Sequence, residues 1–409
     1  MKLREDADNI IKASLQAVLP DEAVARALAG KEFGGRVYMV AAGKAAWQMA
    51  HVAAKILDEK LTAGVVVTKY DHVKGEIPKT VCYEAGHPVP DENSFRATQA
   101  ALDLVSGLSK EDTVLFLLSG GGSALFEKPL ISGEELSELT QSLLASGADI
   151  VEINTLRKHL SAVKGGRFAL ACMPAQVYSI VLSDILGDPL DMIASGPAYP
   201  DSSTGEDALR IAEKYQISLS AHARELLLQE TPKTLSNVET QITGSVRELC
   251  RAAEEAAQKI GYETIVLTDQ LSCEAKEAGA FLAAIAKTHQ DSKKSLAFIA
   301  GGETVVHLTG KGKGGRNQEL ALSAAEGIAG LSDTAVFSIG SDGTDGPTDA
   351  AGGYCDQNTK GVLLEQNISI YDVLRENDAY HALQKSGGLI LTGATGTNVN
   401  DVAVLLIRR

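Results

Sequence analysis

Short, continuous apolar segments alternate with amphipathic segments along the first half of the chain. A continuous apolar run predicts a strand buried on both faces, and apolar residues at intervals of three and four predict a helix. The predicted strands are 36–44, 64–70, 80–86, 113–120 and 176–184, and the predicted helices are 45–57, 91–108, 132–147 and 153–171. This alternation is typical of an α/β fold in which helices cover both faces of a parallel sheet. Ligands of such sheets bind beyond the carboxyl ends of the strands.

The pattern weakens between 198 and 236, where turn-forming residues gather, and then resumes. We therefore place a domain boundary near 233, which divides the chain into domains 1–232 and 233–409. The second domain has predicted strands near 238–243, 264–269, 295–302 and 334–343, helices at 247–260, 274–288 and from about 317, a hairpin at 301–310, and a final strand-like pair at 388–396 and 401–409.

The composition argues against several kinds of site and partner. A chain of 409 residues is too long for one ordinary hydrophobic core, which agrees with two domains. The five cysteines include no CxxC pair, which argues against a zinc site or a disulfide framework and fits a reducing compartment. The formal charge of −15 argues against nucleic acid and acidic membranes as partners. No apolar run approaches the ~20 residues that span a bilayer, and the amino-terminal segment lacks the features of a signal peptide. We expect a cytoplasmic protein whose anionic substrate, if it has one, binds at a local basic site.

A glycine-rich turn follows the predicted strand 113–120. It reads Ser119-Gly120-Gly121-Gly122-Ser123. Glycine lets backbone N–H groups turn inward and lets an oxyanion approach closely, whereas a mere strand-to-helix turn needs fewer glycines. We interpret the turn as an anion-binding loop, with a simple tight turn as the alternative.

Gly43-Lys44 ends the first predicted strand. The pair is not a Walker A motif, because Tyr38 stands where the first glycine of that motif would fall and Ala45 replaces its Ser or Thr. A lysine at the carboxyl end of a strand still points its ammonium group toward the ligand crevice. A solvated lysine is an equally good interpretation.

The densest cluster of glycine and basic residues is GGETVVHLTGKGKGGRNQE at 301–319. Its GxGxxG spacing at 310–315 raises the possibility of a dinucleotide site, but the acidic partner expected about 20 residues on is misplaced, since Asp333 precedes the next strand. The inserted lysines and Arg316 fit a phosphate or a carboxylate better, and Arg316 could stabilise a transferring phosphoryl group. A solvated basic loop without a ligand remains the alternative.

Aspartates follow two predicted strands. Asp184 and Asp188 lie in LSDILGDPLD, and Asp342 and Asp345 lie in GSDGTDGPTD. Mg²⁺ in phosphoryl transfer is held by one or two carboxylates together with phosphate oxygens. For each aspartate singly, a turn-forming role is the better interpretation, yet we expect at least one to bind metal.

Three further polar residues could reach the crevice. His87 follows a strand, although a packing or capping role suits it better, and Arg157 and Lys158 lie on a predicted helix where surface salt bridges would explain them equally well.

These motifs together resemble the class II glycerate kinases, the glycerate 2-kinases with a carboxyl-terminal MOFRL domain, some of which carry the older label hydroxypyruvate reductase. The resemblance covers essentially the whole chain, through VAAGKAAWQMA, EAGHPVPDE, LFLLSGGGSALFE, INTLRKHLSAVKGGR, GGETVVHLTGKGKGGRNQELALSAA and GSDGTDGPTDAAGG. It implies a Rossmann-like amino-terminal domain, a smaller α/β domain with the MOFRL region at about 297–405, and an active site in the cleft between them.

The resemblance also implies the reaction, which is transfer of the γ-phosphate of ATP to the 2-hydroxyl of D-glycerate with Mg²⁺ or a similar divalent ion. The family's proposed catalytic pair falls at Lys44 and Arg316. We expect the following residues to bind nucleotide, phosphate or substrate: Gly43, Ser119, Gly120, Gly121, Gly122, Ser123, Gly301, Gly302, Glu303, Gly314, Gly315 and Asn317. A nicotinamide-dependent hydroxypyruvate reductase is the second hypothesis, and an anion-binding sensor without catalysis is the third. The sequence leaves monomer or homodimer undecided.

Overall fold

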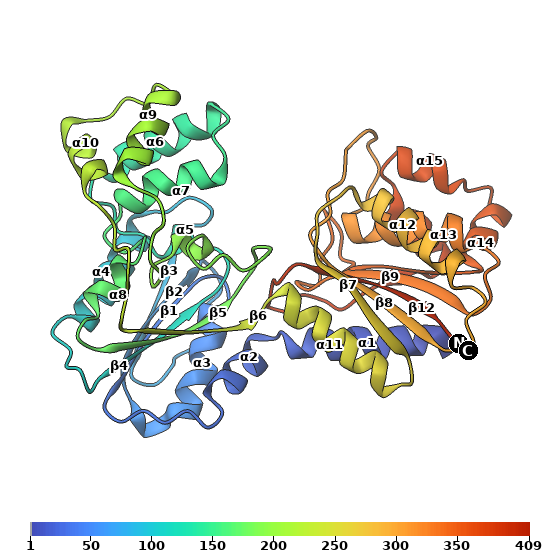
Figure 1. Ribbon diagram of the computed structural model, residues 1–409, viewed down its shortest axis with the longest axis horizontal. Helices are drawn as coiled ribbons and strands as arrows, with labels where there is room; N and C mark the ends of the chain where they lie inside the picture. The colour runs from blue at the N-terminus through green and yellow to red at the C-terminus, as the bar shows by residue number, and fades with distance from the viewer. Residues whose placement is uncertain (1) are drawn as a thin grey trace. The chain divides into compact units, whose positions relative to one another are not determined.

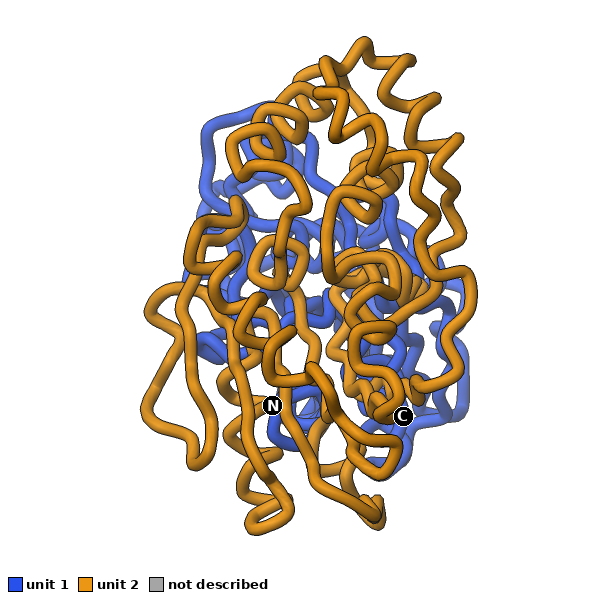
Figure 2. The backbone as a smooth tube through the Cα atoms, turned by 90° about the vertical axis from the view of Figure 1, so that its left-hand side faces the viewer, with its two compact units in different colours: residues 1–22, 244–409 blue, residues 23–243 orange. Residues whose placement is uncertain are grey.

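The computed structural model describes residues 2–409 and divides into two compact units (Figure 2). The parallel-sheet unit comprises Ala23–Thr243, and the mixed-sheet unit comprises Gly244–Arg409 together with residues 2–22. The boundary therefore differs from the predicted 232/233 in two ways. The strand predicted at 238–243 belongs to the first sheet, and the first helix of the chain belongs to the second unit.

The parallel-sheet unit contains six strands in the order β3-β2-β1-β4-β5-β6 (Figure 1). The strands are β1 Val37–Ala42, β2 Leu61–Lys69, β3 Thr80–Ala85, β4 Thr113–Leu118, β5 Gln176–Leu182 and β6 Val238–Gly244. The pairs from β3 to β5 are all parallel. This is the strand order of the Rossmann fold, so the predicted Rossmann-like architecture is confirmed. The order reverses between β1 and β4, and there the carboxyl ends of the two strands form a ligand crevice in such folds.

Both faces of this sheet are covered, which explains the continuous apolar strands. On β1, Val40 belongs to one buried core with residues of α4 and α8, and its neighbours Met39 and Ala41 belong to the other core with residues of α3. The helices and short 3-10 turns of the unit are α2 Pro20–Leu28, α3 Ala46–Leu57, η1 Asp58–Lys60, α4 Glu92–Val105, α5 Gly122–Leu125, α6 Gly133–Ala145, α7 Ile150–His159, α8 Arg167–Ala171, η2 Ile193–Ser195, α9 Gly205–Lys214 and α10 Ala221–Leu228. Helices α6, α7, α9 and α10 enclose a further small core of their own (Figure 1).

The helix predicted at 153–171 is wrong as a single element. The structure has α7 and α8 instead, separated by Gly165 and Gly166, whose φ angles are +57° and +85°. Two consecutive left-handed residues cannot continue a right-handed helix, and glycine adopts that conformation without steric cost.

The mixed-sheet unit has strands in the order β11-β10-β9-β12-β8-β7. The strands are β7 Glu263–Leu271, β8 Leu296–Gly302, β9 Thr334–Gly340, β10 Gly352–Asp356, β11 Leu389–Ile390 and β12 Asp401–Ile407. In the described part of this sheet, β7 and β8 pair in parallel and the other pairs are antiparallel, as predicted for a smaller mixed α/β unit. Of the two strands predicted at the end of the chain, 401–409 is confirmed as β12, which lies between β8 and β9. Of the segment predicted at 388–396, only the two-residue edge strand β11 forms.

Helices cover both faces of the mixed sheet. They are α1 Lys2–Ala17, α11 Val246–Lys259, α12 Ala275–Thr288, α13 Arg316–Ile328, α14 Thr359–Glu365, α15 Ile370–Arg375 and α16 Ala379–Ser386. Helices α12 and α13 share one core with β8, β9 and β12. Helix α11 packs on β7 and β8, and α1 packs along α11 (Figure 1).

Helix α1 is fixed to the mixed-sheet unit by a buried ionic contact. Tyr262 donates to Asp6 Oδ2 at 2.7 Å, and Arg408 forms an ion pair with the same carboxylate. The apolar face of α1, which includes Ile10 and Ile11, is buried. An amphipathic helix needs a packing partner, and for α1 that partner lies more than 200 residues along the chain. No helix within residues 2–409 has the length and apolar character needed to cross a membrane.

Candidate active site

Two loops meet at the point where the strand order of the parallel sheet reverses. Lys44, directly after β1, donates its backbone N–H to Gly120 O at 2.9 Å, and Ala45 N donates to Ser119 Oγ at 3.1 Å. A Cβ at Gly43 would lie 2.3 Å from Ser119 Oγ, and the φ of Gly43 is +125°, so glycine is required there on both counts. The structure thus brings together the two loops that the sequence singled out separately. Ser119 is buried in this contact and holds the loops together.

Lys44 and His87 lie against Gly121. A Cβ on Gly121 would be 3.2 Å from Lys44 Cγ and 3.0 Å from His87 Nε2, and the φ of Gly121 is +85°. The Lys44 side chain is exposed, and its backbone carbonyl accepts from Thr68 Oγ1 at 3.2 Å. Burial, followed by the positive charges of Lys44 and Lys69, lowers the pKa of His87. The lowered pKa favours the neutral imidazole of His87. His87 lies beside the glycine-rich loop, whereas the sequence favoured a packing or capping role for it.

Asp184, after β5, reaches the same loop. Its Oδ2 atom would lie 2.2 Å from a Cβ at Gly120, so the carboxylate rests directly on the glycine backbone. Asp188 follows in a turn with φ of +52°, and its buried Oδ1 atom has no hydrogen-bond partner among residues 2–409. Gly122 faces the Cβ of Ala194, where a side chain would clash at 2.7 Å. Gly122 therefore serves packing, whereas Gly120 and Gly121 line the face that holds Lys44, His87 and Asp184.

In the mixed-sheet unit, Arg316 begins α13 and is held by two carboxylates. Its Nε and Nη2 atoms donate to Asp401 at 2.6 and 3.1 Å, and Nη1 donates to Glu303 Oε1 at 2.9 Å. Burial opposes the charge of Arg316, but the hydrogen bond and charge of Asp401, with the charge of Glu303, raise its pKa above the usual value. Burial raises the pKa of Asp401 to about 6 even though Arg316 donates to it, and the charge of Asp345 adds to the rise.

Asp401 was missed by the sequence analysis. It opens the last strand, in TNVND, without any local motif that indicates an arginine partner. Only the antiparallel pairing of β12 with β8 and β9 brings it to Arg316.

Asp345 caps helix α13. Its Oδ1 accepts from the backbone N–H of Asn317 at 3.1 Å, and its Oδ2 accepts from that of Gln318 at 2.9 Å. A carboxylate at a helix amino terminus is favoured by the macrodipole and by the unpaired N–H groups. Asp345 is 3% exposed, and burial raises its pKa despite these hydrogen bonds. Asp345 thus occupies the position that a phosphate would take at this helix terminus.

Asn317 and Asp342 are also engaged internally. Asn317 is 1% exposed, and its side-chain amide lies between Asp345 and Ser338 Oγ, which donates to Asn317 Oδ1 at 2.5 Å. Asp342 is half-buried and accepts from Thr344 N at 2.9 Å within its own turn. The turn-forming role considered for Asp342 is therefore what its contacts show.

The glycines of the 310–315 segment are explained by close packing. A Cβ at Gly310 would lie 2.3 Å from Glu376 backbone atoms, and one at Gly312 would lie 2.6 Å from Glu376 O. Asn377 Oδ1 accepts from Thr309 N at 2.8 Å and from Gly310 N at 2.9 Å. The segment is therefore an ordered loop anchored on 376–378, and the GxGxxG spacing needs no dinucleotide to explain it. The predicted hairpin at 301–310 is wrong for the same reason, since this segment pairs with other parts of the chain.

The remaining predicted glycines are also close-packed. A Cβ at Gly301 would lie 2.3 Å from Cys250 Sγ, and one at Gly302 would lie 2.1 Å from Leu271 O. A Cβ at Gly315 would lie 2.3 Å from the Asp345 carboxyl carbon, whereas Gly314 has its nearest neighbour at 3.3 Å. Gly302 lets β8 approach the backbone of Leu271 in β7, whereas Gly301 and Gly315 leave room for Cys250 and Asp345.

The four predicted metal-binding aspartates are divided between the two units. Asp184 and Asp188 belong to the parallel-sheet unit, and Asp342 and Asp345 belong to the mixed-sheet unit. Within residues 2–409 no group of three or more His, Cys, Asp or Glu side chains is placed to hold a metal ion.

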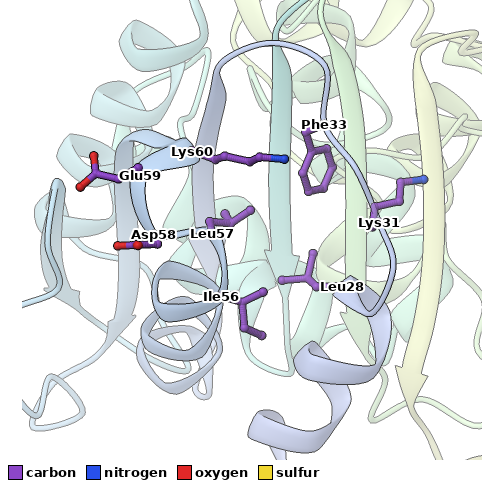
Figure 3. Close-up of a pocket in the computed structure, with 8 residues that line it drawn as sticks. All are labelled: Leu28, Lys31, Phe33, Ile56, Leu57, Asp58, Glu59 and Lys60. Atoms are coloured by element: carbon purple, nitrogen blue, oxygen red, sulfur yellow. The ribbon is translucent and has the colours of Figure 1, made fainter.

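A cavity of about 270 Å³ lies at the amino ends of β1 and β2 (Figure 3). The glycine-rich loop lies at the other end of the strands, after their carboxyl ends. Its lining residues are Leu28, Lys31, Phe33, Ile56, Leu57, Asp58, Glu59 and Lys60. Of its two lysines, Lys31 is paired with Glu239 at 2.6 Å. We place the candidate site at the carboxyl edge, where the loops and charged groups converge.

Two family models match parts of the chain. Residues 6–228 match a family described as a domain of unknown function, DUF4147, and residues 296–401 match the MOFRL family. The D-glycerate 2-kinase of Thermotoga maritima is 54% identical to the chain over 99% of the chain and 98% of that protein. The chain belongs to the glycerate 2-kinase family. The chain thus contains the MOFRL domain that the resemblance implied.

Two further relatives and one solved structure are similar to the chain over most or all of their length. The glycerate 2-kinase of Pyrococcus horikoshii is 41% identical over 100% of the chain and 98% of that protein. The crystal structure of glycerate kinase from Thermotoga maritima has a TM-score of 0.96 and covers 99% of both chains at 54% identity. A protein of Agrobacterium vitis that is provisionally named hydroxypyruvate reductase is 38% identical over 91% of the chain and 87% of that protein.

Proposed function

We propose that the chain transfers the γ-phosphate of ATP to the 2-hydroxyl of D-glycerate, giving 2-phosphoglycerate and ADP. The observation that carries the proposal is the 54% identity, over the full chain, to a protein named D-glycerate 2-kinase. The local chemistry supports it, because each unit presents one cation at an ordered glycine-rich loop. These cations are Lys44 and Arg316.

Lys44 and the Gly120–Gly121 backbone would bind phosphate oxygens at the crevice of the parallel-sheet unit. Arg316 uses three of its five N–H donors on Asp401 and Glu303, so two donors remain for a phosphoryl group. Catalysis of phosphoryl transfer consists mainly of positioning and charge stabilisation, so a lysine and an arginine suffice without an obvious general base. The proposal requires closure of the two units, so that both cations act on the same phosphoryl group and water is excluded.

The carboxylates beside the glycine-rich loop fit a divalent ion. Asp184 rests on Gly120, and the buried Oδ1 atom of Asp188 lacks a partner in the described chain. Mg²⁺ needs only one or two carboxylates when phosphate oxygens and water complete its shell, so the absence of a larger acidic group within residues 2–409 does not argue against it. Asp184 and Asp188 would hold Mg²⁺, which would offset the charge of the ATP phosphates. Asp345 fits less well, because both its oxygens accept helix N–H groups.

Incubation of the protein with D-glycerate, ATP and Mg²⁺, followed by phosphorus NMR, tests the proposal. We expect the signal of 2-phosphoglycerate and an equal amount of ADP. The 3-isomer would overturn the regiochemistry, and absence of a phosphoglycerate would overturn the function.

Hydroxypyruvate reduction is the second candidate, and the names of the Agrobacterium vitis relatives favour it. Consumption of NADH or NADPH with hydroxypyruvate would support it. The packing of the 310–315 segment and the carboxylate cap on α13 leave that segment without a free helix terminus for a pyrophosphate. We therefore expect no reduction of hydroxypyruvate.

A further inference from the structure

Three charged side chains lie buried behind the Ser119–Ser123 loop. They are Lys164, Arg157 and Glu127, whose side chains are 0%, 12% and 1% exposed. The carboxylate Oε2 of Glu127 lies 3.4 Å from Lys164 Nζ and 3.3 Å from Arg157 Nη2. We call these residues the buried charge cluster.

Both cations of the buried charge cluster hold the end of the loop. Lys164 Nζ donates to Ser123 O at 2.8 Å, and Arg157 Nη2 donates to the same oxygen at 2.9 Å. The Ser123 hydroxyl contacts Ser195 Oγ at 3.2 Å, and Ser195 donates to Asn154 Oδ1 at 2.9 Å. The loop is thus fixed at its backbone by two charged donors and at its side chain by a chain of neutral hydrogen bonds.

The buried charge cluster carries one positive charge more than it can neutralise internally. Two cations share one carboxylate, and Glu127 Oε1 and Arg157 Nε have no partner among residues 2–409. Burial lowers the pKa of Lys164 to about 8, an effect that Glu127 opposes and Arg157 increases. Uncompensated buried charge is costly, so a purely structural ion pair would not need the second cation.

The Ser119–Ser123 loop itself contains no charged side chain, and the chain as a whole carries a formal charge of −15. A charge buried in the protein interior is screened less than an exposed one, so it acts strongly on a ligand a few ångströms away. We propose that Lys164 and Arg157 are positioning residues that give the Ser119–Ser123 loop its affinity for the anionic oxygens of a substrate, from behind and without touching it. The identity of that anion, an ATP phosphate or the glycerate carboxylate, rests on the proposed function.

Replacing one cation leaves the other paired with Glu127, so the variants Lys164→Met and Arg157→Met each retain a balanced ion pair and are expected to fold. Titration calorimetry with ATP, D-glycerate and inorganic pyrophosphate as separate probes measures the effect. We expect at least one probe to bind about tenfold more weakly to each variant. A change confined to ATP and pyrophosphate identifies phosphate as the anion, and a change confined to D-glycerate identifies the carboxylate.

The matched control is Lys110→Met, which removes the same charge from an exposed site of the same unit, where the side chain is 79% exposed. We expect its affinities to equal those of the unchanged protein. Unchanged affinity of Lys164→Met for all three probes would overturn the proposal. Weaker pyrophosphate binding without formation of phosphoglycerate would support the proposal and overturn the proposed function instead.

The unchanged protein provides a second test, which does not depend on the folding of a variant. The charged groups that face Lys164 are Glu127 and Arg157. Burial and nearby positive charges lower the pKa of His87, so this side chain is already neutral in the pH range of the test and does not contribute to the change. Affinity for the responsive probe is therefore expected to fall as the pH rises from about 7 to about 9, through the pKa of Lys164 at about 8. Affinity that stays constant over this interval would contradict the proposal.

Discussion

At the scale of single residues, the side chains of Arg316 and Lys164 are each held by several partners. Arg316 is fixed by Asp401 and Glu303, and Lys164 is fixed by Glu127 and two backbone carbonyls. Such contacts pre-organise a cation, so that less side-chain entropy is lost when a ligand binds. The two cations differ in exposure: Arg316 is 32% exposed and can touch a substrate, whereas Lys164 is fully buried.

Substitution of Arg316 tests its catalytic role. In Arg316→Ala we expect kcat to fall by about 10³-fold, the lower end of what an arginine contributes to phosphoryl transfer. Steady-state kinetics of phosphoglycerate formation measure the effect, and circular dichroism checks the fold. The matched control is Arg251→Ala in α11 of the same unit, an arginine that is 44% exposed and pairs with Glu248 and Glu255 on its own helix, and its kcat is expected to stay unchanged. Turnover near normal in Arg316→Ala would remove Arg316 from the mechanism.

Lys164 also predicts a pH dependence of stability. Its pKa is about 8 in the folded protein against an ordinary value of 10.5. Between these values the unfolded chain binds the proton and the folded chain does not, so the free energy of unfolding rises with pH in this window. The rise from this group is about 3 kcal/mol at most. Urea unfolding at about pH 8 and about pH 10 should show a larger increase in the unchanged protein than in Lys164→Met. Parallel behaviour of the two proteins would contradict the pKa assignment.

At the scale of elements, the strands and their loops were predictable, whereas the breaks and anchors were not. Strands β1, β4 and β5 are continuous apolar runs, and the Rossmann order places Lys44, Gly120 and Asp184 at one edge. The anchoring of the 310–315 segment on Asn377 depends on residues some 65 positions away, which no local pattern encodes. For the same reason the glycines of that segment looked like a ligand loop, although their neighbours are backbone atoms of the protein.

A substitution in the glycine-rich loop tests its geometry. In Gly120→Ala the new methyl group would meet Asp184 Oδ2 at 2.2 Å, so either the carboxylate or the loop must move. We expect kcat/KM to fall by about tenfold or more, because a displacement near 1 Å is enough for such a loss. The matched control is Gly361→Ala in α14, where a Cβ has no neighbour within 4 Å. That variant should keep full activity and gain about 0.5–1 kcal/mol of stability. Equal activity of the two variants would show that the Asp184–Gly120 contact is dispensable.

At the scale of the whole molecule, the parallel-sheet unit is inserted into the mixed-sheet unit, because residues 2–22 pack with Gly244–Arg409. The apolar and polar positions of residues 2–17 indicate an amphipathic helix that must pack on another element. This pattern does not say which element that is. The choice of α11 depends on complementary packing and on the contacts of Asp6 with Tyr262 and Arg408. This is why the predicted boundary assigned α1 to the wrong unit.

The attachment of α1 to the mixed-sheet unit predicts that a mutation in this helix destabilises that unit. Asp6→Ala leaves the buried hydroxyl of Tyr262 and the guanidinium of Arg408 without their shared acceptor. We expect a loss of about 1–3 kcal/mol in stability. Hydrogen exchange should accelerate within 244–409 and remain unchanged within 23–243. The control is Asp8→Ala, whose side chain is 53% exposed and pairs with Arg4 in the same helix, at an expected cost of about 0.5 kcal/mol. Faster exchange confined to 23–243 would refute the assignment.

The inserted arrangement also sets an order of events during synthesis of the chain. Helix α1 leaves the ribosome before its partner α11, which begins at Val246, after the entire parallel-sheet unit has been made. At about 5–20 residues per second, the apolar face of α1 waits for roughly 10–50 seconds before it can be covered. During that interval the parallel-sheet unit is synthesised as one uninterrupted segment and can fold by itself. The contact between Asp6 and Arg408 can form only once residue 408 has been added, and it joins α1 to the residue that follows β12.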